Sequence, residues 1–67
     1  MNRLELAQRV VASQERTCDK CDVMLVVTDA TEINDWVAVR ARCPRCATLY
    51  TVRVTERNMA RYAGRNG

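Results

Sequence analysis

The feature that most constrains this chain is a pair of short cysteine motifs on either side of its middle. Cys18 and Cys21 are separated by two residues, and after 21 further residues Cys43 and Cys46 repeat the same spacing. A tight turn of this length can aim both of its sulfurs at one ion, and two such turns close a tetrahedral thiolate site. The pattern therefore predicts one structural Zn²⁺ bound by all four cysteines.

The segment between the motifs has the composition of a β-hairpin, which would bring the second pair back to the first. Residues 23–28 form a short apolar, β-branched run, and residues 36–42 alternate between apolar and polar side chains, so both are predicted strands. The polar residues 29–35 are predicted to form the hairpin loop. After the second motif, residues 48–55 alternate again and predict a third strand, with Tyr50 on its apolar face.

An amphipathic helix is predicted over residues 3–15. Asn2 and Glu5 have the spacing of a helix capping box. The apolar residues that follow recur on one helical face: Leu4, Ala7, Val10 and Val11, with Leu6 at its edge. This stripe either packs on the sheet or docks on a partner, and the sequence leaves both open.

A short second helix is predicted over residues 56–63, with Thr55 as its N-cap and Gly64 as a left-handed C-terminal cap. The fold class we predict is a small zinc-stabilised β fold, a three-stranded antiparallel sheet with a helix at each end. Its predicted divisions are the N-terminal helix (1–16), the metal-binding sheet (17–55) and a basic C-terminal helix and tail (56–67).

A chain of 67 residues buries only about 60% of the surface that its unfolded form exposes. Folds this small usually need a cross-link such as a metal, disulfides or a partner chain. The first residues lack the apolar region of a signal peptide, so we expect a cytoplasmic protein, in a compartment where disulfides are rare. Two disulfides, a redox-active pair and a four-thiolate iron site remain alternatives to zinc.

The chain contains no histidine. With all four thiols committed to one ion, no open coordination position is left for metal catalysis. We therefore expect a binding protein that is not an enzyme and that takes no small-molecule substrate. No apolar stretch approaches the roughly 18 residues of a membrane span, so no membrane partner is expected.

The second motif, "RCPRC" at residues 42–46, is followed by a β-type run. In this respect the chain resembles a zinc ribbon, and over about residues 18–54 it is similar to the Com-type small translational regulators of phages. The resemblance implies a small, phage-encoded regulator that binds nucleic acid. Asp22 and Ala47 stand where a glycine often follows each cysteine pair, and the hairpin is longer than in that family. Because Asp tolerates a left-handed backbone better than Ala, we expect the second turn to be the less ideal.

Charge is divided unevenly along the chain. Residues 1–39 carry four basic and seven acidic side chains, whereas residues 40–67 carry seven arginines and only Glu56, so their net charges are −3 and +6. Four thiolates on Zn²⁺ would lower the total from +3 to about +1, so the asymmetry is the better indicator. It predicts a nucleic-acid-binding surface. The candidate residues are Arg40, Arg42, Arg45, Arg53, Arg57 and Arg61. These arginines could instead simply solubilise the chain, or face an acidic protein.

The chain has three aromatic residues, Trp36, Tyr50 and Tyr62. By strand alternation Trp36 shares a face with Arg40 and Arg42. There it could stack on a base, but we expect it to cover the core from the end of the strand. Both tyrosines are predicted core residues.

Two functions follow from these observations. The first is a nucleic-acid-binding regulator that acts on DNA or RNA through its arginines. The second is a protein-binding adaptor or inhibitor that docks on a large machine such as RNA polymerase or the ribosome, using the N-terminal helix and the arginine stripe of the C-terminal helix.

Overall fold

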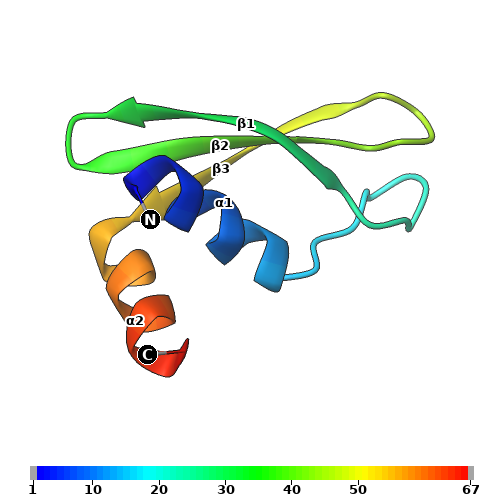
Figure 1. Cartoon of the computed structure of the whole chain (residues 1–67). Coiled ribbons are helices and arrows are strands. Elements are labelled where there is room, and N and C mark those ends of the chain that lie inside the picture. The colour runs from blue at the N-terminus through cyan, green and yellow to red at the C-terminus, as the bar shows by residue number, and fades with distance from the viewer. Residues whose placement is uncertain (1, 67) are drawn as a thin grey trace.

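Alternating side chains build a three-stranded antiparallel sheet in which the strands lie in the order β1-β2-β3. The computed structural model describes residues 2–66, with side chains described to residue 64. Its elements are α1 (Arg3–Ser13), β1 (Val26–Ile33), β2 (Trp36–Arg42), β3 (Leu49–Thr55) and α2 (Glu56–Asn66). Both helices lie on the same side of the sheet (Figure 1). The predicted three-stranded antiparallel sheet with a helix at each end is confirmed.

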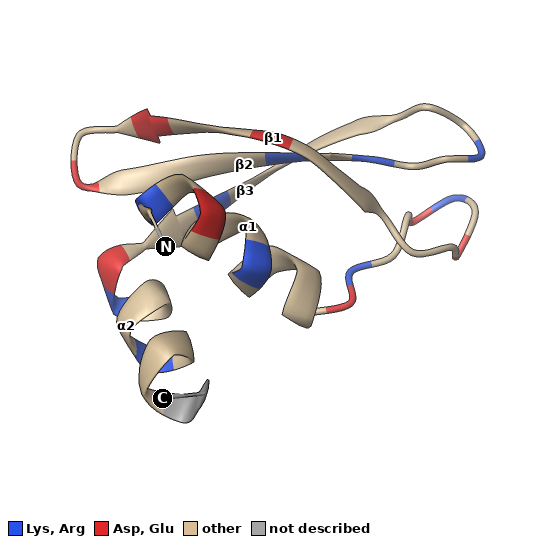
Figure 2. Cartoon of the chain, viewed as in Figure 1, with Lys and Arg blue, Asp and Glu red and all other residues tan. Residues whose placement is uncertain are grey.

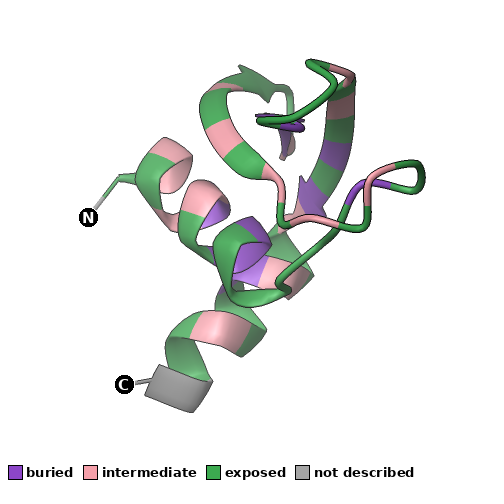
Figure 3. Ribbon diagram, turned by 90° about the vertical axis from the view of Figure 1, so that its right-hand side faces the viewer, coloured by how far each residue is buried: buried purple, intermediate pink, exposed green. Residues whose placement is uncertain are grey.

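The core lies between the sheet and the helices. Val37, Val39 and Ala41 of β2 are fully buried, as the alternation of this strand predicts. The apolar stripe of α1 covers them, so buried surfaces of the helix and the sheet face each other (Figure 3). Val37 and Val39 belong to a core cluster whose other members are Ala7, Val10, Val11, Val52, Val54 and Met59. Of the two roles left open for the N-terminal helix, packing on the sheet is the one found.

α1 begins where the capping residue predicts and ends two residues early. The Asn2 side chain accepts a hydrogen bond of 2.8 Å from the Glu5 backbone N–H, which satisfies a free donor of the first turn. The helix ends at Ser13 because the chain turns there, with Glu15 in a left-handed conformation at φ 51°.

The predicted hairpin loop over residues 29–35 is wrong. β1 runs through this polar segment to Ile33, and only Asn34 and Asp35 form the turn, with Asn34 at φ 52°. Pairing with the central strand outweighs the low strand propensity of the polar residues, since the strand preference of a residue depends on its neighbours. The predicted strand over 23–28 also begins late, because Met24 forms an isolated bridge with Thr17 beside the first cysteine pair.

A β-bulge at Thr28 sets the register of β1. Val27 pairs with Ala41, but Asp29 pairs with the next residue, Arg40, so one residue of β1 has no partner in the ladder. If Thr28 instead took a regular place in the ladder opposite Arg40, Asp29 would pair with Val39 and point toward the helices. The bulge therefore places a carboxylate beside an arginine on the uncovered face.

α2 starts at its predicted cap. The Thr55 hydroxyl accepts a hydrogen bond of 3.2 Å from the Asn58 backbone N–H, and the Asn58 side chain accepts one of 3.0 Å in return from the Thr55 N–H. The predicted C-cap at Gly64 is wrong, because the helix continues to Asn66 and no glycine within residues 2–66 has a positive φ. Gly67, the last residue of the predicted tail, lies outside the described residues.

Replacing Val37 by Ala should lower the free energy of unfolding by about 2 kcal/mol, because two fully buried methyl groups are lost and a cavity is left. The same change at Val26, which is 54% exposed on the neighbouring strand, should cost less than about 1 kcal/mol. Urea unfolding of the metal-loaded variants measures both values. Equal losses would contradict the assignment of the helix-covered face as the core.

Candidate metal centre and outer sheet face

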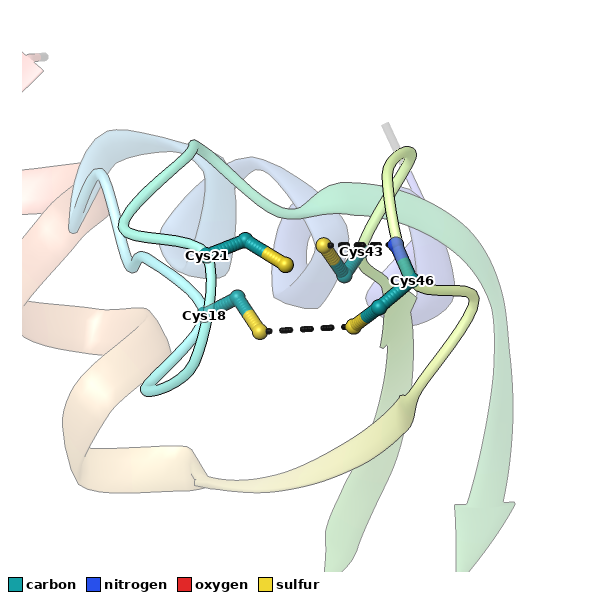
Figure 4. A group of neighbouring side chains, drawn as sticks. All are labelled: Cys18, Cys21, Cys43 and Cys46. Atoms are coloured by element: carbon teal, nitrogen blue, oxygen red, sulfur yellow. Dashed lines mark hydrogen bonds between the residues drawn. The ribbon is translucent and has the colours of Figure 1, made fainter.

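The first cysteine pair sits on a tight turn between α1 and β1. The Asp22 N–H donates to the Cys18 carbonyl at 2.9 Å, and the Cys18 N–H donates to the Val23 carbonyl at 2.9 Å. Closing this turn requires a left-handed residue after the second cysteine, and Asp22 supplies it at φ 55°. The turn directs the Sγ atoms of Cys18 and Cys21 to the same side (Figure 4).

The second pair repeats this geometry between β2 and β3. The Ala47 N–H donates to the Cys43 carbonyl at 2.9 Å, and the Cys43 N–H donates to the Thr48 carbonyl at 3.0 Å. The backbone N–H groups of Arg45 and Cys46 both point at the Cys43 Sγ from 3.4 Å. Ala47 occupies the left-handed position at φ 67°, where an alanine is strained by its Cβ.

The two turns bring all four sulfurs together. Every Sγ lies within 4.8 Å of the others, and the Sγ atoms of Cys18 and Cys46 are 3.6 Å apart (Figure 4). In a tetrahedral site with metal–sulfur bonds of about 2.3 Å, the sulfurs are about 3.8 Å apart. A disulfide needs about 2.05 Å, and all four cysteines are free thiols. Cys18, Cys21, Cys43 and Cys46 therefore form one group that can hold a metal ion.

Hydrogen bonds within the cluster shift the pKa values of its thiols in opposite directions. The pKa of Cys46 falls to about 6, chiefly because the Thr48 hydroxyl and N–H donate to its sulfur. The pKa of Cys21 rises to about 12, chiefly because its S–H donates to Cys46, with burial and its hydrogen bond to Cys43 adding to the rise. One sulfur thus keeps its proton to stabilise the charge of another, and a divalent cation can replace that proton.

Two hydroxyl groups complete the surroundings of the sulfurs, and neither was predicted as a site residue. The Tyr50 hydroxyl donates to the Cys18 Sγ at 3.3 Å and accepts from the Asp19 N–H at 3.4 Å. The hydrogen bond from Tyr50 to the Cys18 Sγ is the main reason that the pKa of Cys18 is lowered. The Thr48 hydroxyl lies 3.1 Å from the Cys46 Sγ. Tyr50 was predicted to be a core residue, and it is half-buried on the inner face with its polar end at the cluster.

The second surface of interest is the outer sheet face, the side of the sheet turned away from the helices. Strand register places twelve side chains on it: Val26, Asp29, Thr31, Ile33, Trp36, Ala38, Arg40, Arg42, Leu49, Thr51, Arg53 and Thr55. Val26 is 54% exposed and Leu49 is 66% exposed, and they flank Arg42 on the neighbouring strands. Neither helix covers this face (Figure 1).

Two arginines of this face have defined partners. Arg40 forms a bidentate pair with Asp29, with bonds of 2.7 and 2.8 Å, and the pKa of Arg40 is raised by these bonds. The Arg53 guanidinium carbon lies 4.8 Å from the centroid of the Trp36 ring. Trp36 is half-buried on the outer face and does not belong to the core cluster, so the expectation that it covers the core is wrong.

The six predicted arginines do not form one surface. Arg40, Arg42 and Arg53 share the outer sheet face, and Arg45 is exposed on the second cysteine turn. Arg57 and Arg61 are exposed on α2, which extends away from the sheet on the side of α1 (Figure 2). The sheet and α2 would therefore meet a ligand from different directions.

A scan against protein-family models, a search of curated proteins and a search of solved structures each returned no match. Within residues 2–66, neither helix has the length and apolar character needed to cross a membrane.

Replacing Ala47 by Gly should raise the free energy of unfolding by about 0.5–1 kcal/mol, because relief of the left-handed strain exceeds the added chain entropy. The matched control is Ala60→Gly, an exposed position within α2, which should cost about 1 kcal/mol. Chemical denaturation of the metal-loaded proteins measures the change in the free energy of unfolding for each variant, which should be positive for Ala47→Gly and negative for Ala60→Gly. A loss at both positions would show that the second turn carries no strain at Ala47.

Replacing Tyr50 by Phe should weaken metal affinity about tenfold, because the hydroxyl that stabilises the Cys18 thiolate is lost. The measurement is competition for Zn²⁺ between the protein and a chromophoric chelator. Tyr62→Phe serves as the control, since Tyr62 packs against the core from α2, and it should leave the affinity unchanged. Equal affinities for all three proteins would remove Tyr50 from the metal centre.

Proposed function

We propose that this protein is a zinc-ribbon regulator that binds nucleic acid through its outer sheet face and acts by binding, without catalysing a reaction. One structural Zn²⁺ holds the two cysteine turns together, and the sheet that they anchor presents the binding surface. Both parts rest on the described geometry and on general ligand chemistry.

Zinc is the metal that best fits the donor set. Four sulfurs from two turns, with no histidine or carboxylate among them, are typical ligands of a closed structural zinc site. When bound, Zn²⁺ supplies a cross-link and a positive charge, and it has no redox chemistry of its own. The chain positions the ligands through the backbone hydrogen bonds of the two turns. A four-thiolate iron site uses the same residues, and the measurement below distinguishes it by mass.

The observation that carries the nucleic-acid proposal is the composition of the outer sheet face. Arg42 and Arg53 are exposed there, and neither has an ion-pair partner within the described residues. The one acidic side chain of this face, Asp29, is paired with Arg40. Phosphate contacts from arginine supply most of the affinity in nonspecific nucleic-acid binding. An uncovered face with unpaired arginines and no unpaired acid is suited to that contact.

Docking of α1 on a protein partner has less support. Ala7, Val10 and Val11 are buried against the sheet, so docking through this stripe would require the core to open. The adaptor function remains the competing outcome of the experiment.

We expect native mass spectrometry to detect one Zn²⁺ per chain and a complex with nucleic acid that weakens as salt is raised. Each phosphate contact contributes about 0.7–0.9 to the slope of log affinity against log salt. Arg42→Gln should therefore weaken binding and reduce that slope by about 0.7–0.9. Arg9→Gln, the same charge change on the exposed side of α1, is the control and should leave the slope unchanged.

Three results would contradict the proposal in different parts. A mass four hydrogens below that of the apo thiol form would mean two disulfides. Detection of bound iron would mean that the metal is iron and not zinc. A zinc-loaded chain that binds neither DNA nor RNA would favour the adaptor function.

A further inference from the structure

We propose that the ligand of the outer sheet face is single-stranded nucleic acid, and that one of its bases stacks on the Arg53–Trp36 pair. This inference rests on the proposed nucleic-acid function and adds the class of substrate and the residues that contact a base.

The first observation is the stacked pair itself. Arg53 on β3 reaches over the ring of Trp36 on β2, with its guanidinium carbon 4.8 Å from the ring centroid. The guanidinium lies over the indole ring, and Arg53 is exposed to solvent. A planar guanidinium held on an aromatic ring is a surface on which an unstacked base can lie. The indole thus holds the Arg53 side chain in place before a ligand binds. Binding then costs less side-chain conformational entropy than it would with a free arginine.

The second observation is the low cost of covering the neighbouring side chains. Ile33 pairs with Trp36 and is 37% exposed. Further along the sheet, Val26 and Leu49 flank Arg42. Covering exposed apolar groups with a base lowers the free energy of the complex. Covering charged side chains would instead require their dehydration. The face therefore offers both apolar groups for bases and unpaired arginines for phosphates.

The third observation is the shape of the face, which favours a single strand over a duplex. The major groove admits a helix or a two-stranded ribbon, and this face is a three-stranded sheet. Bases in a duplex are stacked on each other, so their planes cannot reach Arg53. Because Asp29 pairs with Arg40, few arginines remain for phosphates, and affinity for a duplex backbone alone should be weak.

A second copy of the chain is a poorer occupant of the same face. Two outer sheet faces packed together would bring the arginines of one copy against those of the other, and like charges in an interface oppose association. A polyanion neutralises Arg42 and Arg53 instead.

The test uses the full zinc-loaded chain, whose one tryptophan reports on the site directly. Oligo-dT and oligo-rU of ten nucleotides and a DNA duplex of ten base pairs are titrated while tryptophan fluorescence and the anisotropy of a labelled strand are recorded. We expect either single strand to change the Trp36 emission and to bind more tightly than the duplex. Comparison of the two single strands reports whether the 2′-hydroxyl contributes.

Two variants isolate the stacking contact. Trp36→Leu should weaken single-strand binding about tenfold, the effect of losing one stacked base. Arg53→Lys keeps the charge but loses the planar group, so affinity should fall while the salt slope stays the same. Arg9→Lys is the matched control and should behave as the unaltered protein. One zinc per chain and an unchanged circular dichroism spectrum establish that each variant is folded.

The outcomes separate this inference from the function on which it rests. If single strands and duplex bind equally, with no change in Trp36 emission and no effect of Arg53→Lys, stacking is overturned while nucleic-acid binding stands. If no nucleic acid binds, both are overturned. An Arg53→Lys variant with full single-strand affinity would overturn the stacking contact even if Trp36→Leu failed to fold.

Discussion

The structure depends on the convergence of four sulfurs at the junction between its two cysteine turns. The largest fully buried side chains of this chain are valines, so the core alone buries little apolar surface. The two turns join the start of β1 to the β2–β3 connection, and Tyr50 links the inner face of β3 to the same cluster. A metal bound at this point would tie the segment before β1 to the β2–β3 connection at one end of the sheet, and its binding free energy would become folding free energy.

The helices determine which face of the sheet is available for function. α1 and α2 lie on the inner face (Figure 1), where the alternation of β2 puts its valines. All other long side chains of β2 are consequently directed to the outer face. The bulge at Thr28 then adjusts the charge of that face by bringing Asp29 opposite Arg40. Packing on one side thus defines a surface with a limited number of unpaired cations on the other.

Much of the fold and the grouping of the four cysteines could be predicted because their signals are local. The spacing of the cysteines, the cap at Asn2 and the alternation of β2 each depend on a few neighbouring residues. β1 could not be predicted correctly, since its polar residues become a strand only through pairing with β2. The contact of Tyr50 with Cys18 joins positions 32 residues apart, and the Asp29–Arg40 pair requires a bulge. No local pattern signals either one. Gly64 had the composition of a cap, but the helix continues through it.

The distribution of the arginines changes how affinity for a polyanion should arise. A net charge of +6 over residues 40–67 predicts binding dominated by phosphate contacts. In the structure these charges are divided between the outer sheet face, the second cysteine turn and α2, and Arg40 is paired internally. With two unpaired arginines on the sheet, the salt slope for a single strand should be only about −1.4. If the measured affinity exceeds what two phosphate contacts can supply, the remainder must come from uncharged contacts. The stacked Arg53 and Trp36, with the exposed apolar side chains beside them, are the groups on this face able to supply it.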